Sequence, residues 1–153
     1  MKTSTLDLSN VFRSLPAAIL ILDTNMVVLA ATDNFYKFTL TKPETLLGKN
    51  LFDAFPENDN TAEAKGARKI RASIEQVILN KQTHILPVQR YDLKLPTGKS
   101  GEFTTRWWRI TNSPVLNISG ELIYVINAVE DITSMVDKLE EAQLAIIRKQ
   151  KKT

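Results

Sequence analysis

The chain has 153 residues, of which 43% are apolar and 24% are charged, a composition typical of one globular domain with a short appendage. The absence of cysteine excludes disulfides, thiolate catalysis, cysteine-ligated zinc and iron–sulfur clusters. The formal charge of +3 depends on a basic C-terminus, which we interpret as a solvated helix end rather than a nucleic-acid or lipid site, and which contains Arg148, Lys149, Lys151 and Lys152.

The first half of the chain predicts a hairpin between helices. Residues 8–15 favour a short helix, and the apolar runs 18–23 and 26–31 are separated by Thr24 and Asn25, with Asn25 suited to a left-handed turn. Both faces of these strands should be largely covered. Asp33 is expected to cap a helix over 34–39, and Thr41 and Glu44 have the spacing of a capping box before a second one, with Gly48 as its stop.

The second half predicts a long helix and then strands. A brief apolar turn over 51–55 precedes a helix over 62–80, whose buried face is formed by Ala67, Ile70, Ile74, Val77 and Ile78. Strands follow at 85–95, at 102–115 with an interruption only at Pro114, and at 122–131. Two strands separated from three by helices indicate an α+β fold in which one antiparallel sheet carries helices on one face.

The order of short motifs resembles a PAS domain. The matching pieces are ATDNF at 31–35, LLGKNLF at 46–52, WWRITNSPV at 107–115 and DIT at 131–133. Tyr91 and Asp92, with NSPV at 112–115, are similar to PAS domains of bacterial sensor histidine kinases. The resemblance implies a five-stranded antiparallel sheet, an N-terminal flanking segment over 1–14, a sensor domain over 15–133 and a C-terminal signalling helix over 134–153.

A ligand site is the second implication of the resemblance. Alternate strand residues share one face, and the faces expected to point at the ligand space carry Trp108, Ile110, Asn112, Val125, Asn127 and Val129. Tyr91, Tyr36, Phe52 and Ile74 are expected to join this wall. Asn112 and Asn127 either face a ligand or bond the backbone in a filled core, and the sequence leaves both interpretations open.

Signals in such domains leave through the DIT element into the next helix. Asp131, Ile132 and Thr133 form this element, and a carboxylate or hydroxyl there also suits a helix N-cap. The following helix has a short heptad pattern, with Ile132, Leu139 and Ile146 at a positions and Met135 and Ala142 at d positions. We expect Leu139, Ala142 and Ile146 to pair two copies as parallel helices; a single helix folded back on the sheet is the alternative.

The cofactor branches of this family differ at single residues. Leu51 stands where the light-sensing branch carries its reactive cysteine, which excludes adduct photochemistry but not non-covalent flavin. The single histidine, His84, follows the long helix and is expected to be solvated, so haem is not expected. The acidic residues Asp53, Glu57, Asp59 and Glu63 lack the glycine and glutamate spacing of a calcium loop, and no metal is predicted.

The apolar runs are too short to cross a bilayer and the N-terminus lacks a signal-peptide core, so we expect a cytoplasmic protein without a membrane segment. No nucleophile elbow, phosphate loop or dinucleotide fingerprint is present, and catalysis is not expected. Two functions remain. One is a ligand-binding sensor that is the input part of a bacterial histidine kinase, and the other is a ligand-free dimerisation or docking module.

Overall fold

The computed structural model describes residues 4–56, 66–95 and 102–152. The helices are α1 Leu8–Arg13, α2 Asp33–Thr39, α3 Pro43–Leu46, α4 Leu51–Ala54, α5 Gly66–Asn80 and α6 Thr133–Lys151. The strands are β1 Ala18–Leu22, β2 Val28–Ala31, β3 His84–Ile85, β4 Gln89–Arg90, β5 Leu93–Lys94, β6 Phe103–Thr104, β7 Trp107–Leu116 and β8 Leu122–Asp131.

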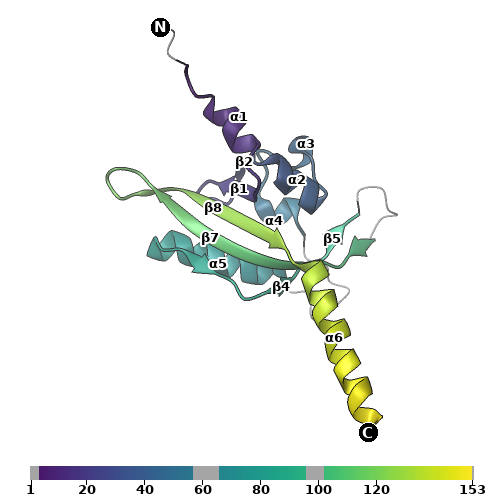
Figure 1. Cartoon of the computed structure of the whole chain (residues 1–153). Helices are drawn as coiled ribbons and strands as arrows, with labels where there is room; N and C mark the ends of the chain where they lie inside the picture. Colours follow the sequence, from purple (N-terminus) through teal and green to yellow (C-terminus); the bar gives the residue numbers. More distant parts are fainter. Residues whose placement is uncertain (1–3, 57–65, 96–101, 153) are drawn as a thin grey trace.

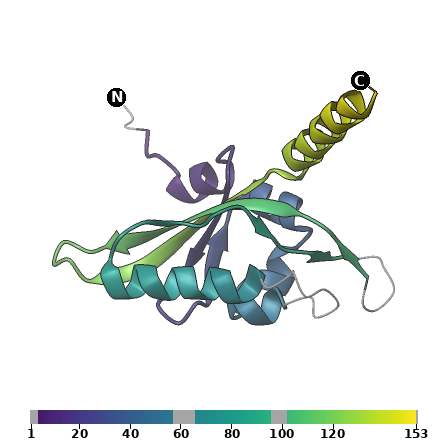
Figure 2. The same ribbon diagram turned by 90° about the horizontal axis from the view of Figure 1, so that it is seen from below.

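The main sheet is antiparallel and runs β2-β1-β8-β7-β3, with β4 also paired to β7. Because β3 and β4 pair with successive parts of the same neighbour, together they fill the fifth position in the sheet (Figure 1). Helix α5 lies along one face, as Figure 2 shows. The predicted α+β class and its antiparallel sheet are therefore confirmed.

The turn between β1 and β2 differs from the predicted one. Asp23 organises it, because its Oδ1 accepts hydrogen bonds from the backbone N–H groups of Asn25 (2.8 Å) and Val27 (2.9 Å). The left-handed residue is Met26, with a φ of 64°, and not Asn25. Leu29, which lies at an irregularity in the β1–β2 pairing, is 46% exposed, so the expected covering of both faces fails at this residue.

The predicted caps of the short helices are shifted by one residue. Thr32, not Asp33, caps α2: its buried hydroxyl accepts from the Phe35 N–H and donates to the carbonyl of Ala17, which ties the helix to β1. Lys42 precedes α3, and its N–H donates to the hydroxyl of Thr45. Asp33 fits the cap of α2 by spacing but loses to Thr32, whose hydroxyl also bonds the chain at the start of β1.

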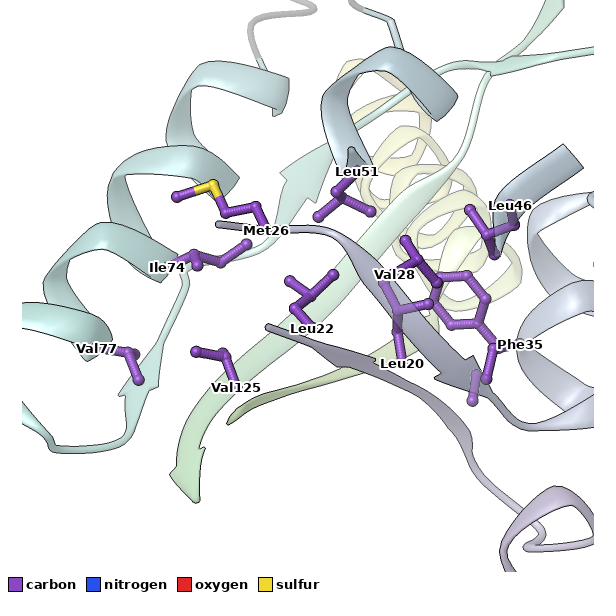
Figure 3. Close-up of a cluster of buried hydrophobic side chains, with 12 residues drawn as sticks. Leu20, Leu22, Met26, Val28, Phe35, Leu46, Leu51, Ile74, Val77 and Val125 are labelled. Carbon is purple, nitrogen blue, oxygen red and sulfur yellow. The ribbon is translucent and has the colours of Figure 1, made fainter. Parts of the chain in front are cut away.

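The long helix α5 begins at Gly66 in the described part of the chain; residues 62–65 of its predicted range lie outside that part. Its apolar face packs against the sheet as the periodicity predicts, since Ala67, Ile74 and Val77 are buried. Figure 3 shows Ile74 and Val77 pointing at Leu22, Met26 and Val125 of the sheet side. Each such side chain contributes about 1.5–3 kcal/mol through its removal from water.

Two predicted strands are broken. Residues 84–94 form three two-residue strands, of which β3 and β4 pair with β7 and β5 pairs with β6. Pro87, between β3 and β4, has no backbone N–H to donate to the sheet. The strand predicted over 102–115 divides into β6 and β7 at Thr105 and Arg106. Pro114 does not interrupt β7, since β3 pairs only with Thr111 and Asn112 and leaves that edge free beyond them. The strand over 122–131 is confirmed.

Candidate functional site

A cavity of about 60 Å³ lies between β7, β8 and the helices that cover the sheet. Six of the predicted wall residues border it: Phe52, Tyr91, Trp108, Ile110, Asn127 and Val129. Sequence reasoning missed the others, which are Phe35, Thr39, Leu51, Phe55, Ala67, Ile70 and Leu93. The helical spacing that identified the buried face of α5 contained Ala67 and Ile70 and was the signal available for them.

Four predicted wall residues lie elsewhere. Ile74 and Val125 are fully buried in the neighbouring core cluster, and Asn112 is fully buried behind Asn127. Tyr36 packs partly against the same core cluster. Period-two alternation places Asn112 and Val125 on the correct face of the sheet, but the cavity occupies only the part of that face near Trp108.

Aromatic rings form much of the cavity wall and are held by specific contacts. Phe55 meets both Phe35 and Tyr91 edge to face, with ring centroids 6.2 and 6.3 Å apart. The Tyr91 hydroxyl donates to the carbonyl of Pro56 (2.7 Å), and the Trp108 Nε1–H donates to the carbonyl of Tyr91 (3.1 Å). The guanidinium of Arg71 lies 4.2 Å from the centre of the Phe52 ring. These contacts fix the shape of an almost wholly apolar space.

Four polar side chains form a hydrogen-bonded chain that leads away from the cavity. Asn127 Nδ2 donates to Asn112 Oδ1 (2.7 Å), Asn112 Nδ2 donates to Ser73 Oγ (2.9 Å), and Ser73 Oγ is 2.7 Å from His84 Nδ1. The two amides therefore bond side chains, which neither sequence interpretation contained. His84 is half-buried and engaged rather than solvated, and it does not border the cavity.

The junction between β8 and α6 is closed by short hydrogen bonds. Asp131 Oδ1 accepts from both the N–H (3.0 Å) and the hydroxyl (2.6 Å) of Thr133. Thr133 Oγ1 accepts from the N–H of Trp107 (2.9 Å), and the N–H of Ile132 donates to the carbonyl of the same residue (2.8 Å). Arg106 forms an ion pair with Asp131, with 3.5 Å between Nε and Oδ2. The start of α6 is thereby attached to the start of β7.

Beyond this junction α6 projects away from the sheet (Figure 1). None of its described residues is buried, so the alternative in which it folds back on the sheet was wrong. Of the residues predicted to pair two copies, Leu139 and Ile146 are 60% and 57% exposed, and Ala142 is exposed as well. Their role in pairing stays a prediction.

Within residues 4–56, 66–95 and 102–152 there is no group of three or more potential metal-ligating side chains. No helix in the same ranges combines the length and apolar character needed to cross a membrane. One titration shift stands out near the short helices: burial raises the pKa of the Tyr36 hydroxyl, and the carboxylates of Asp33 and Glu44 raise it further.

Comparisons with known proteins agree with this architecture. A search among curated proteins finds no match to the sequence. Among solved structures, a sensory box sensor histidine kinase from Vibrio cholerae shares 18% identity with a TM-score of 0.54, over 82% of this chain and 89% of that one. A PAS domain from Colwellia psychrerythraea shares 11% identity with a TM-score of 0.60, over 83% and 95%.

A third solved structure, the Vibrio cholera VqmA–ligand–DNA complex, shares 20% identity with a TM-score of 0.61, over 86% of this chain and 53% of that one. At these identities the likeness concerns the fold. The family model described as the PAS fold matches residues 12–137, which is most of the chain. The protein therefore belongs to the PAS family.

Proposed function

We propose that this chain is a sensory PAS domain that binds a small molecule in the cavity beside Trp108. The state of the cavity passes through Asp131, Ile132 and Thr133 to α6. Two copies of α6 pair through Leu139, Ala142 and Ile146, and an output domain outside this chain reads their arrangement. The domain binds a small molecule and transmits a signal; it does not catalyse a reaction.

One observation carries this proposal: adjacent residues of β7 serve the cavity and the helix. Trp108 borders the cavity, while Trp107 holds α6 through its N–H to Thr133 and its carbonyl to the N–H of Ile132. Neighbouring strand residues share one rigid backbone. A ligand that shifts the Trp108 ring therefore also shifts the hydrogen bonds that set the direction of α6.

The wider setting follows from the family and its relatives. The likeness to a sensor histidine kinase from Vibrio cholerae supports a role as the input part of a bacterial two-component kinase. A cytoplasmic location is part of the same proposal. Any kinase activity would belong to a domain outside this chain. The chain has no cysteine for a flavin adduct, and His84, already bonded to Ser73, does not border the cavity where haem would sit.

Native mass spectrometry of the purified protein, followed by denaturation and an absorbance scan, tests the proposal. We expect a dimer that releases a small molecule on denaturation. Visible absorbance bands would separate haem or flavin from a colourless metabolite. A dimer that never carries or accepts a small molecule, at any concentration tested, would contradict the sensor function.

The size of the cavity favours a second candidate, a docking module without a ligand. A cavity of about 60 Å³ is smaller than the ~150 Å³ engineered cavity that holds benzene. The docking function predicts that the cavity stays empty and that dimers form all the same. The variant Asn127→Leu distinguishes the two functions by ligand binding. If the protein is a sensor, the variant should bind ligand more weakly and dimerise as before; if it is a docking module, neither protein should bind a ligand.

A further inference from the structure

We infer that Asn127 selects the occupant of the cavity, and that the occupant is a small, neutral, mostly apolar ring that donates one hydrogen bond to Asn127 Oδ1. The inference deepens the proposed sensory function and rests on it. Asn112 and Ser73 act as positioning residues, because they hold the Asn127 amide in the orientation that presents its oxygen.

Among the lining residues that the structure describes, Asn127 has a side-chain amide oxygen that receives no hydrogen bond. It is 3% exposed, and its Nδ2 donates to Asn112 Oδ1, while no group in the described part of the chain donates to its Oδ1. The other polar lining groups are engaged: the Thr39 hydroxyl donates to the carbonyl of Phe35, the Tyr91 hydroxyl to that of Pro56, and the Trp108 indole to that of Tyr91. A buried acceptor without a donor costs free energy that a suitable ligand recovers.

The hydrogen-bonded chain behind Asn127 fixes which end of its amide is used. Asn112 Oδ1 accepts from Asn127 Nδ2, and Asn112 Nδ2 is itself committed to Ser73 Oγ. The Ser73 hydroxyl then has its own proton free for His84 Nδ1. The amide donors of Asn127 and Asn112 both point away from the cavity, so rotation of the Asn127 amide alone would place its Oδ1 against Asn112 Oδ1, two acceptors.

The rest of the wall defines the remaining chemistry of the occupant. No charged side chain borders the cavity among the described residues, so an ionised ligand would lose its hydration without a counter-charge. Phe35, Phe52, Phe55, Tyr91 and Trp108 present ring faces and edges. A volume of about 60 Å³ limits the occupant to a ring smaller than benzene, and a larger ligand would have to displace Phe55 or Tyr91, which line both this cavity and a neighbouring one of about 40 Å³.

Pyrrole and furan test the inference, because they are five-membered neutral rings of matched shape and pyrrole has an N–H donor that furan lacks. Each is titrated into the full chain, and binding is followed by the amide and indole resonances of β7 and β8 in ¹H–¹⁵N spectra. We expect pyrrole to bind about five- to tenfold more tightly than furan, the effect of one buried neutral hydrogen bond. In Asn127→Leu this preference should disappear.

The positioning role is tested by Ser73→Ala, which is compatible with a helix and removes the anchor of Asn112. We expect the pyrrole preference to shrink towards equality while the affinity for furan is unchanged. The matched control is Ser113→Ala, since Ser113 bonds Thr83 and takes no part in the chain behind Asn127. A Ser73→Ala protein that is less stable but keeps the full preference would overturn the positioning role.

The titrations distinguish a failure of selection by Asn127 from a failure of binding in the cavity. Equal affinities for pyrrole and furan in the unaltered protein would overturn the selection by Asn127 and leave the cavity as a binding site. If neither ring perturbs the resonances of β7 and β8 at millimolar concentration, the proposed binding function fails and this inference fails with it.

Discussion

Asp131 and Thr133 are joined by two hydrogen bonds to a single carboxylate oxygen, one from the hydroxyl at 2.6 Å and one from the backbone N–H at 3.0 Å. The residue between them, Ile132, is buried. The chain thus changes from strand to helix at a buried isoleucine, and the polar residues before and after it are hydrogen-bonded to each other. The angle at which α6 leaves the sheet is set within these three residues.

Thr133→Val should loosen this junction without a change of side-chain shape. Valine loses the bond to Asp131 and leaves the Trp107 N–H without its partner, so we expect the free energy of unfolding to fall by about 1–3 kcal/mol. Urea denaturation measures the change. Thr133→Ser keeps the hydroxyl and is the control; if both variants unfold alike, the hydroxyl does not hold the junction.

Leu139→Asp should weaken dimers if the predicted heptad pattern forms the interface. A carboxylate at an a position cannot be buried against a second helix, and we expect the dimer dissociation constant to rise at least about tenfold. Leu144→Asp is the matched control, because Leu144 is a similarly exposed leucine of α6 outside the predicted a and d positions. Sedimentation equilibrium gives both constants. Unchanged dimers in the Leu139 variant would move the interface to another surface, with residues 6–15 the next candidate.

The β1–β2 hairpin offers a matched pair of leucines that separates its buried face from its exposed one. Leu22 is fully buried in the core cluster, whereas Leu29 is 46% exposed. We expect Leu22→Ala to lower the free energy of unfolding by about 2–5 kcal/mol and Leu29→Ala by less than about 0.5 kcal/mol. Thermal and urea denaturation measure both. A large loss at Leu29 would show that a partner or a second copy covers that side chain in solution.

Tyr36 links stability to alkaline pH. Because burial and then the nearby carboxylates of Asp33 and Glu44 raise its pKa in the folded state, the unfolded chain ionises first as pH increases. The contribution of Tyr36 to stability is complete below the ordinary tyrosine pKa and is lost as pH rises through that value to the raised one. We expect Tyr36→Phe to lose less stability than the unaltered protein between about pH 9 and about pH 11. Urea denaturation across this range provides the measurement, and parallel decline of the two proteins would contradict it.

Periodicity predicted the parts of the fold that depend on which face of an element is apolar. Ile74 and Val77 on α5 and the alternation through Trp108, Ile110 and Asn112 are buried as expected. Features that depend on one contact between residues distant in the sequence were missed. Thr32 caps α2 because its hydroxyl also bonds the carbonyl of Ala17, a residue 15 positions away, and no local pattern contains that contact.

The candidate site was predicted mainly on the sheet, and most of its helix residues were missed. Strand alternation gives a face, so Trp108, Ile110, Asn127 and Val129 were found. Phe35 and Phe55 come from short helices whose orientation is decided by tertiary packing, so their place in the wall could not be read from spacing. The bond from Asn127 to Asn112 required the pairing of β7 with β8, which places the two residues opposite each other.

The exposure of α6 also has an energetic consequence. Since the helix buries none of its own described residues, turning it disrupts no hydrophobic core. The cost is confined to the hydrogen bonds at Trp107, Asp131 and Thr133 and one partly exposed ion pair. A neutral hydrogen bond is worth about 0.5–1.5 kcal/mol, one to the Asp131 carboxylate about 1.5–3 kcal/mol and the ion pair up to about 1 kcal/mol. A small molecule that favours one direction of the helix over another by a few kcal/mol would therefore be enough to change the populations of the two directions.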